Sequence, residues 1–185
     1  MRIDAIDPKK TAMIVLDMQN DFVAASAAME TPAARAAVPK IIEALAICRN
    51  AKIRVIYTAH VHRHEGCDMG LFDDICPPIA KRAALVDGTP GADIYSKLAP
   101  APGEHVTKKH RYSAFFGTDL DIILRAWGVD TIIISGTTTE NCCPGHPRRI
   151  NRTCDVVQKH DGAHTTIRRS SRYRRSQVHK LNFEK

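Results

Sequence analysis

The sequence predicts an α/β fold in which a mostly parallel sheet is covered by helices on both faces, a three-layer α/β/α arrangement. Short apolar runs at residues 11–16, 53–58 and 130–135 have the length and composition of buried strands. Apolar residues at helical spacing occur at 33–50 and 117–127. Strands that alternate with helices form right-handed units whose strands are parallel and whose helices pack on the sheet.

Local signals refine the two helices. Proline lacks an amide donor and clashes with the preceding turn, so Pro39 should lie near the start of the first helix rather than deep within it. Thr118 is a candidate N-cap for the second helix, because its hydroxyl can accept a hydrogen bond from a free backbone amide. Gly128 is placed to end that helix.

Residues 60–104 are rich in Gly, Pro, His and Asp. This composition predicts long loops with little regular structure. A segment of that length in a compact domain usually carries function. A short strand is expected directly after it, at 105–109.

Length and composition indicate one soluble globular domain. A chain of 185 residues with 44% apolar and 25% charged residues can bury a sizeable core. No apolar run approaches the roughly 20 residues that span a bilayer, and the polar N-terminus lacks a signal-peptide core. The six cysteines match no zinc or disulfide spacing. We therefore expect a cytoplasmic protein that has no membrane contact and keeps free thiols.

Positive charge is concentrated in the last part of the chain. Residues 144–185 contain eleven basic and three acidic residues, a net +8, so the other residues sum to −1. This contrast divides the chain into a near-neutral domain at 1–143 and a basic segment at 144–185.

Three segments carry residues that can perform chemistry. Asp17 directly follows a predicted strand, Lys109 ends another, and Cys142 lies where a helix would begin after the strand at 130–135. A helix N-terminus and a nearby ammonium both lower the pKa of a thiol, and a carboxylate can exchange its proton. Each residue also has an ordinary structural interpretation: a helix cap, a solvated charge and a buried thiol.

Taken together, these segments resemble the isochorismatase-like cysteine hydrolases. The matching patterns are Asp-x-Gln-x-Asp-Phe at 17–22, Lys-x-Arg-Tyr-Ser-Ala-Phe at 109–115 and Gly-x-x-Thr-x-x-Cys at 136–142. They occur in the family's order, and the resemblance covers about residues 8–143. The family includes isochorismatases, nicotinamidases, N-carbamoylsarcosine amidases, and biuret and ureidoacrylate hydrolases.

The resemblance implies a catalytic triad. Cys142 would be the nucleophile, Asp17 the general base and acid, and Lys109 the residue that stabilises the thiolate. A cis peptide is implied between Thr137 and Thr138, and the N–H groups of Thr138 and Cys142 would form the oxyanion hole. The implied reaction cleaves the C–N bond of a small amide, carbamoyl or ureido compound through a thioester, without a cofactor.

Five further residues are expected to line the substrate pocket: Phe22, His60, His62, Arg111 and Phe115. Phe115 could equally belong to the core. Cys143 is interpreted as a packing thiol. The family's relatives assemble as oligomers, so a homo-oligomer is expected if the fold is complete.

The histidines at 60, 62 and 64 alternate along one segment, which would place all three on one face of a strand. Such a face could bind a metal ion. Nicotinamidases bind a metal in this region through an Asp-x-His pattern, but here His60 occupies the aspartate position. We therefore expect no metal, and a metal-assisted nicotinamidase-type amidase remains the alternative.

After Cys143 the sequence departs from the family pattern. The family continues with a helix, whereas residues 144–150 read PGHPRRI, and only 155–157 resemble the expected last strand. The fold is therefore expected to be incomplete at its C-terminal end. A frameshift in the gene is the favoured hypothesis. The competing hypothesis is a genuine Arg-rich tail that binds nucleic acid or an anionic surface, and resequencing the gene tests it. A catalytically impaired, truncated product or a nucleic-acid-binding protein is the rival to the enzyme function.

Overall fold

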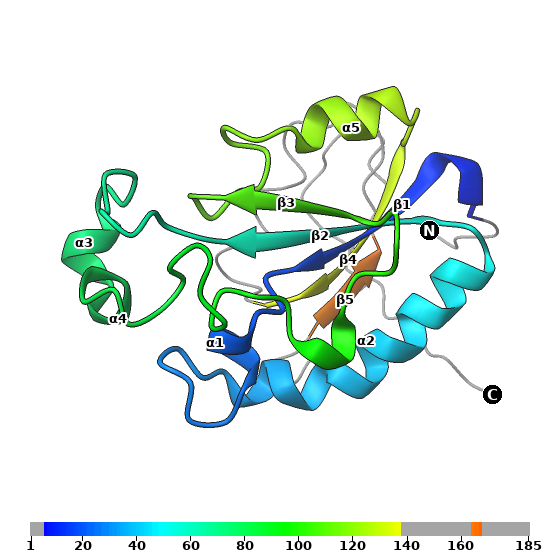
Figure 1. Cartoon of the computed structure of the whole chain (residues 1–185). Coiled ribbons are helices and arrows are strands. Elements are labelled where there is room, and N and C mark those ends of the chain that lie inside the picture. Colours follow the sequence, from blue (N-terminus) through cyan, green and yellow to red (C-terminus); the bar gives the residue numbers. More distant parts are fainter. Residues whose placement is uncertain (1–5, 138–163, 168–185) are drawn as a thin grey trace, which may run out of the picture.

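The computed structural model describes residues 6–137 and 164–167. Its centre is a five-stranded sheet in the order β3-β2-β1-β4-β5, in which the first four strands are parallel and β5 is antiparallel to β4 (Figure 1). The strands are β1 (Thr11–Leu16), β2 (Arg54–His60), β3 (His105–Lys109), β4 (Thr131–Gly136) and β5 (His164–Ile167).

The predicted parallel sheet is confirmed. Strands β1 and β3 have the predicted bounds, β4 is displaced by one residue, and β2 continues two residues further, to His60. The region of the expected last strand, 155–157, lies outside the described residues. The strand that pairs with β4 is instead at 164–167, in a segment with little apolar periodicity.

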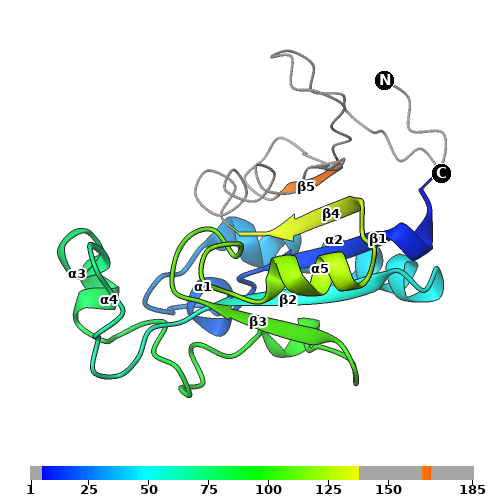
Figure 2. The ribbon, with the colours of Figure 1, turned by 90° about the horizontal axis from the view of Figure 1, so that it is seen from above.

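The sheet has a helix on each face. Figures 1 and 2 show α2 (Pro32–Asn50) and α5 (Leu120–Ala126) on opposite sides of the central strands. Successive side chains of β1 point to opposite faces: Met13 and Val15 join the α2 core cluster, and Ile14 and Leu16 join the α5 cluster. The buried α2 residues include Val38, Ile41 and Leu45, and those of α5 are Leu120 and Leu124. Packing on both faces explains why these strands are apolar throughout.

The prediction for Pro39 was wrong. Helix α2 begins at Pro32, runs on through Pro39 and ends at Asn50. An interior proline costs a helix about 3 kcal/mol. Six residues of α2 are buried against the sheet, and this apolar stripe extends well past the proline. Tertiary packing therefore outweighs the local preference.

Helix α5 begins three residues later than expected, at Leu120. The Thr118 hydroxyl still accepts a hydrogen bond from the Leu120 amide at 3.2 Å, and it donates to the carbonyl of Ala114. Thr118 therefore supports the start of the helix although it is not the residue that directly precedes it.

The long segment after β2 contains only short helices: α3 (Phe72–Ile75), α4 (Pro77–Ala80) and the 3-10 turn η2 (Ser96–Leu98). Helices α3 and α4 project beyond the carboxyl ends of β2 and β3 (Figure 1). Two further short pieces are η1 (Pro8–Lys10) and α1 (Asn20–Val23). Within the described ranges, no helix is long and apolar enough to cross a membrane.

Candidate active site

Asp17 lies immediately after β1, at the carboxyl edge of the sheet. Its backbone is left-handed, with φ +49°, and its side chain is 1% exposed. A residue with a Cβ adopts this conformation at a cost of about 1–3 kcal/mol, and only where the surroundings enforce it. Here the amide of Asp17 donates to the carbonyl of Thr58 at 3.1 Å and contacts its hydroxyl at 3.2 Å. Strand β2 therefore holds the turn.

Lys109 ends β3 and reaches across β2 to Asp17. Its Nζ lies 2.7 Å from Asp17 Oδ2, and neither side chain is exposed to more than 1%. The same Nζ donates to the carbonyls of Arg111 at 3.2 Å and Tyr112 at 3.1 Å. A buried ammonium is tolerated only when its protons are bound in this way. The predicted acid–lysine pair is thus brought together although its two residues are 92 positions apart in sequence.

The carboxylate of Asp17 has a second partner in Thr58, whose hydroxyl donates to Oδ1 at 2.6 Å. Burial alone would raise the pKa of Asp17. The charge of Lys109, with hydrogen bonds from Lys109 and Thr58, outweighs this and holds the pKa below its ordinary value. Asp17 is therefore a carboxylate near neutral pH, the state a general base requires.

Two other polar residues of the motif at 17–22 hold the loops around the site through hydrogen bonds. Gln19 donates to the carbonyls of His60 and Ala92 and accepts from the His60 amide, at 2.8–2.9 Å. Asp21 accepts from the Leu85 amide at 2.7 Å. A Cβ at Gly91 would lie 2.3 Å from the Asp21 carboxylate, so the loop approaches closely only because this residue is glycine. Within the motif, Asp17 carries the candidate chemistry, while Gln19 and Asp21 hold the loop.

His60, the last residue of β2, is buried beside the Asp17–Lys109 pair. Burial and the charge of Lys109 lower the pKa of His60 to about 3, so its ring is neutral at physiological pH. Its Nε2 has no hydrogen-bond partner among the residues that the structure describes. The rings of Phe72 and Tyr112 lie 5.2 and 6.3 Å from its ring. The neutral imidazole of His60, which can donate or accept one hydrogen bond, thus lies beside the Asp17 carboxylate and next to two aromatic rings.

The three alternating histidines do not share a face, so that prediction was wrong. Strand β2 ends at His60, His62 forms an isolated bridge to Val86, and His64 lies exposed in a turn. The rings of His60 and His62 lie 4.9 Å apart, and both are buried. The alternation fails because the backbone turns after His62.

The other predicted pocket residues lie in different surroundings. Phe22 packs in the core cluster on the α2 side, and Phe115 packs in the cluster on the α5 side. Arg111 Nη1 donates to the carbonyls of Asp68 and His110, both at 2.6 Å. The structure thus brings His60 close to the acid–lysine pair and keeps the two phenylalanines on opposite faces of the sheet. Their roles in substrate binding stay predictions.

Strand β4 ends at the same edge of the sheet with Gly136, the first residue of the motif at 136–142. Gly136 pairs with Leu16, and the Thr137 amide donates to the Leu16 carbonyl at 3.1 Å. Gly136 has φ +128°, and a Cβ there would lie 2.1 Å from the carbonyl oxygen of Leu16. Only glycine allows this approach. Thr138, Cys142 and the predicted Thr137–Thr138 cis peptide lie outside the described residues, as does Cys143.

Several residues at this edge were not predicted from the sequence. Thr58 and Gln19 contact the predicted residues directly, and the rings of Phe72 and Tyr112 lie edge-to-face near His60, with centres 5.1 Å apart. Tyr112 lies within the second motif, which was a usable signal. Thr58 lies two positions before His60 on the same strand, so alternation could have placed it on the same face.

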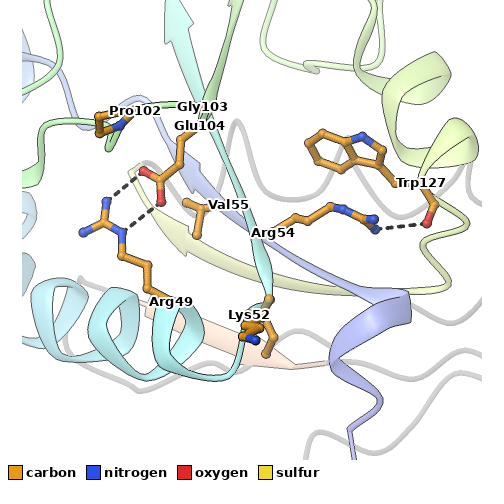
Figure 3. Close-up of a pocket in the computed structure, with 9 residues that line it drawn as sticks. Arg49, Lys52, Arg54, Val55, Pro102, Gly103, Glu104 and Trp127 are labelled. Atoms are coloured by element: carbon orange, nitrogen blue, oxygen red, sulfur yellow. Dashed lines mark hydrogen bonds and ion pairs between the residues drawn. The ribbon is translucent and has the colours of Figure 1, made fainter.

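The opposite edge of the sheet has a different pocket, of about 370 Å³, lined by residues at the end of α2, the amino ends of β2 and β3, and Trp127 after α5. Figure 3 shows Arg49 in a two-bond pair with Glu104, at 2.8 Å for each bond. The Arg54 guanidinium lies 5.2 Å from the Trp127 ring centre. Burial and the Glu104 charge raise the pKa of Tyr57, which Arg49 also contacts, to about 12. Of the predicted catalytic residues that the structure describes, neither Asp17 nor Lys109 lines this pocket.

A parallel sheet with a buried carboxylate–ammonium pair at its carboxyl edge is the type of site at which α/β enzymes bind small ligands. Comparison with known proteins agrees with this class. The Isochorismatase domain profile matches residues 11–151, more than two thirds of the chain. The chain belongs to the isochorismatase family of hydrolases.

Two curated relatives illustrate its place in the family. A probable inactive nicotinamidase from Arabidopsis thaliana is 33% identical over 135 residues, covering 72% of this chain and 69% of that protein. The maleamate amidohydrolase of Pseudomonas putida is 30% identical over 135 residues, covering 72% and 62%. The chain thus spans about two thirds of the length of these relatives.

Solved structures share the fold. A cysteine hydrolase from Pseudomonas syringae pv. phaseolicola has a TM-score of 0.72 and 32% identity, covering 87% of this chain and 81% of that one. The N-carbamoylsarcosine amidase of Thermoplasma acidophilum has a TM-score of 0.67 and 28% identity, covering 80% and 81%. Named relatives therefore include enzymes that act on amide and carbamoyl compounds.

Proposed function

We propose that this protein is a cysteine-dependent amidohydrolase that cleaves the C–N bond of a small amide, carbamoyl or ureido compound. The observation that carries the proposal is the fully buried contact between Asp17 and Lys109 at the carboxyl edge of the sheet. A buried ion pair is expensive to form and contributes little net stability, so its presence favours a catalytic role.

The nucleophile in this proposal is Cys142. Strand β4 delivers the chain to Thr137 beside Asp17, and five residues of chain can extend at most about 17 Å from there. Cys142 is thus within reach of the acid–lysine pair. The ammonium of Lys109 would favour the thiolate, and the Asp17 carboxylate would accept the thiol proton.

The reaction proceeds in two halves. Cys142 Sγ attacks the substrate carbonyl carbon as its proton passes to Asp17, and the N–H groups of Thr138 and Cys142 bind the oxyanion. The C–N bond then breaks, and Asp17 protonates the departing nitrogen, which leaves a thioester. Water attacks the thioester as Asp17 takes its proton, and the Cys142 thiol leaves with that proton as the acid product is released.

The neighbouring groups suit a small neutral or weakly polar head group. His60 is neutral, with its Nε2 unpartnered in the described part of the chain, so it can donate or accept one hydrogen bond. The rings of Phe72 and Tyr112, which lie edge-to-face with each other, offer apolar contacts beside it. An amide or ureido group is small and carries both donors and acceptors, so it could use the His60 hydrogen bond within these apolar surroundings.

Ammonia release tests the proposal. Purified protein is assayed with maleamate, N-carbamoylsarcosine and nicotinamide, together with the Cys142→Ala and Cys143→Ala variants. We expect release from at least one of these compounds, a loss of at least about 1000-fold in kcat/KM for Cys142→Ala, and near wild-type activity for Cys143→Ala, the matched control. Undiminished activity in Cys142→Ala, with circular dichroism showing a folded protein, would contradict a cysteine nucleophile.

A further inference from the structure

The pocket at the amino edge of the sheet lies away from the candidate active site, and the proposed reaction does not use it. Its volume of about 370 Å³ is within the range of about 300–1,000 Å³ that small-molecule sites have. Arg49 near the end of α2, Lys52 in the turn that follows, the start of β2 and Trp127 after α5 contribute to its lining (Figure 3). The pocket can therefore hold a small organic molecule.

Positive charge dominates the lining of this pocket. Arg49, Lys52 and Arg54 are cations, and Glu104 is the one carboxylate among the described residues that line it. Arg49 already neutralises Glu104, because its guanidinium donates to both carboxylate oxygens at 2.8 Å (Figure 3). Lys52 and Arg54 form no ion pair with a carboxylate in the part of the chain that the structure describes. Two positive charges thus remain for an anion.

The Arg54 guanidinium is held in place by weak contacts that leave most of its donors unused. Nη1 donates to the carbonyls of Lys9 at 3.4 Å and Trp127 at 3.2 Å, at or beyond the long end of the usual range. The guanidinium carbon also lies 5.2 Å from the centre of the Trp127 ring, a cation–π contact (Figure 3). Nε and Nη2 make no hydrogen bond to any residue that the structure describes. An arginine can present such a pair of parallel donors to one oxyanion.

Lys52 lies in the turn between α2 and β2, with an exposed side chain and a left-handed backbone at φ +57°. The apolar residues that alternate with the two cations are Ile53 and Val55, which are 9% and 4% exposed. Both also line the pocket. The two cations therefore lie beside an apolar floor, a combination that suits a ligand with a charged group and an apolar body.

We propose that this pocket binds a small phosphate monoester with an aromatic or apolar body. A phosphate monoester carries a charge of about −1.5 to −2 at pH 7, which matches the two positive charges of Lys52 and Arg54. Arginine binds phosphate through parallel N–H groups, and lysine binds it as a point charge. The body of the ligand would lie against Val55 and Trp127. This binding site goes beyond the proposed hydrolase reaction and does not depend on it.

Two features of the pocket oppose an anion, and both are already compensated. The Glu104 carboxylate is bound by Arg49 on both oxygens. The Trp127 carbonyl, at the C-terminal end of α5, is bound by Arg54. The ligand phosphate therefore meets unpaired donors of Arg54 and Lys52 rather than unpaired acceptors.

The fluorescence of Trp127 tests the proposal, because Trp127 is the one tryptophan of the chain and lines the pocket. The full-length protein is titrated with phenyl phosphate, and calorimetry counts the sites. We expect a saturable change with one site per chain and a dissociation constant below about 1 mM. Inorganic phosphate lacks the ring and benzoate carries one charge, so each should bind at least about threefold more weakly.

Variants of the two cations test the assignment of the charged group. Arg54→Gln and Lys52→Gln should each weaken phenyl phosphate binding by at least about threefold. Lys40→Gln is the matched control, because it removes one charge from an exposed position of α2 outside the pocket, and it should bind like wild type. Lys52→Gln keeps the test decisive if Arg54→Gln loses stability, since the Lys52 side chain is exposed.

Three results would overturn the proposal. The first is the absence of saturable phenyl phosphate binding in the wild type. The second is binding of inorganic phosphate or benzoate as tight as that of phenyl phosphate. The third is undiminished binding by Lys52→Gln while circular dichroism shows a folded chain.

Discussion

The two edges of the sheet each carry a carboxylate–cation pair, and the pairs differ in burial. At the carboxyl edge, Asp17 and Lys109 are 2.7 Å apart and essentially inaccessible. At the amino edge, Arg49 and Glu104 are joined by two bonds of 2.8 Å, but the Arg49 side chain is 37% exposed. Similar bond lengths therefore occur in very different dielectric surroundings.

The difference teaches what each pair can contribute. Water solvates the Arg49 guanidinium whether or not Glu104 is present, so that pair is worth at most about 1 kcal/mol. Asp17 and Lys109 have both lost their water, and each depends on the other and on fixed dipoles. The buried pair is consequently sensitive to the loss of one member. Because each charge depends on its partner, the pair adds little net stability as a structural element. The same dependence suits the Asp17 carboxylate to accept and release a proton.

The largest effect is expected from Lys109→Met. This change leaves the Asp17 carboxylate buried with Thr58 as its remaining side-chain hydrogen-bond donor among those the structure records. Removing one partner of a buried pair costs about 3–5 kcal/mol. Urea unfolding followed by circular dichroism measures the loss.

The double variant Asp17→Asn/Lys109→Met is the control for this prediction. It removes both charges while keeping the side-chain volumes similar, and it should recover most of the stability lost in Lys109→Met. If the single and the double variant are equally destabilised, the effect comes from packing and not from an unpaired charge.

A smaller effect is expected from Thr58→Val, which keeps the side-chain shape but removes the hydroxyl that donates to Asp17 Oδ1. A hydrogen bond to a buried charged group is worth about 1.5–3 kcal/mol. The free energy of unfolding should fall by about 2 kcal/mol. Thr107→Val is the comparison, because the hydroxyl of this buried threonine on neighbouring β3 makes only a long contact of 3.4 Å with Asp119, whose side chain is 53% exposed. An equal loss there would show that the Asp17 contact contributes nothing specific.

The smallest effect is expected at the amino edge. Glu104→Gln removes the charge opposite Arg49, and because the guanidinium is partly solvated the free energy of unfolding should change by about 1 kcal/mol or less. The difference from wild type should shrink further in 1 M NaCl. A loss above about 2 kcal/mol that salt does not reduce would remove the contrast between the two edges.

The sequence predicted the parts of this molecule that depend on local patterns. Apolar runs located β1, β2 and β4 because strands buried on both faces are apolar throughout. Pro39 and His64 were misjudged because tertiary packing of α2 and the turn after His62 overrode local periodicity. No short-range pattern indicated β5.

The site was predictable to a similar degree. Motif order indicated that Asp17 and Lys109 belong together, and the structure brings them into contact. The hydrogen bonds that hold the loops around them could not be read from the sequence, since Thr58 and Gln19 bond to residues 41 positions away. His62, Asp68 and His110 likewise come close together from three separate segments, which no short-range pattern indicated.

Turnover by Asp17→Asn tests the central claim, that the buried pair serves catalysis. The variant keeps the shape of the side chain and removes its ability to carry a proton. We expect kcat/KM for ammonia release to fall by about 100-fold or more, while Glu104→Gln stays within about twofold of wild type and both variants remain folded. Wild-type turnover by folded Asp17→Asn would contradict the account.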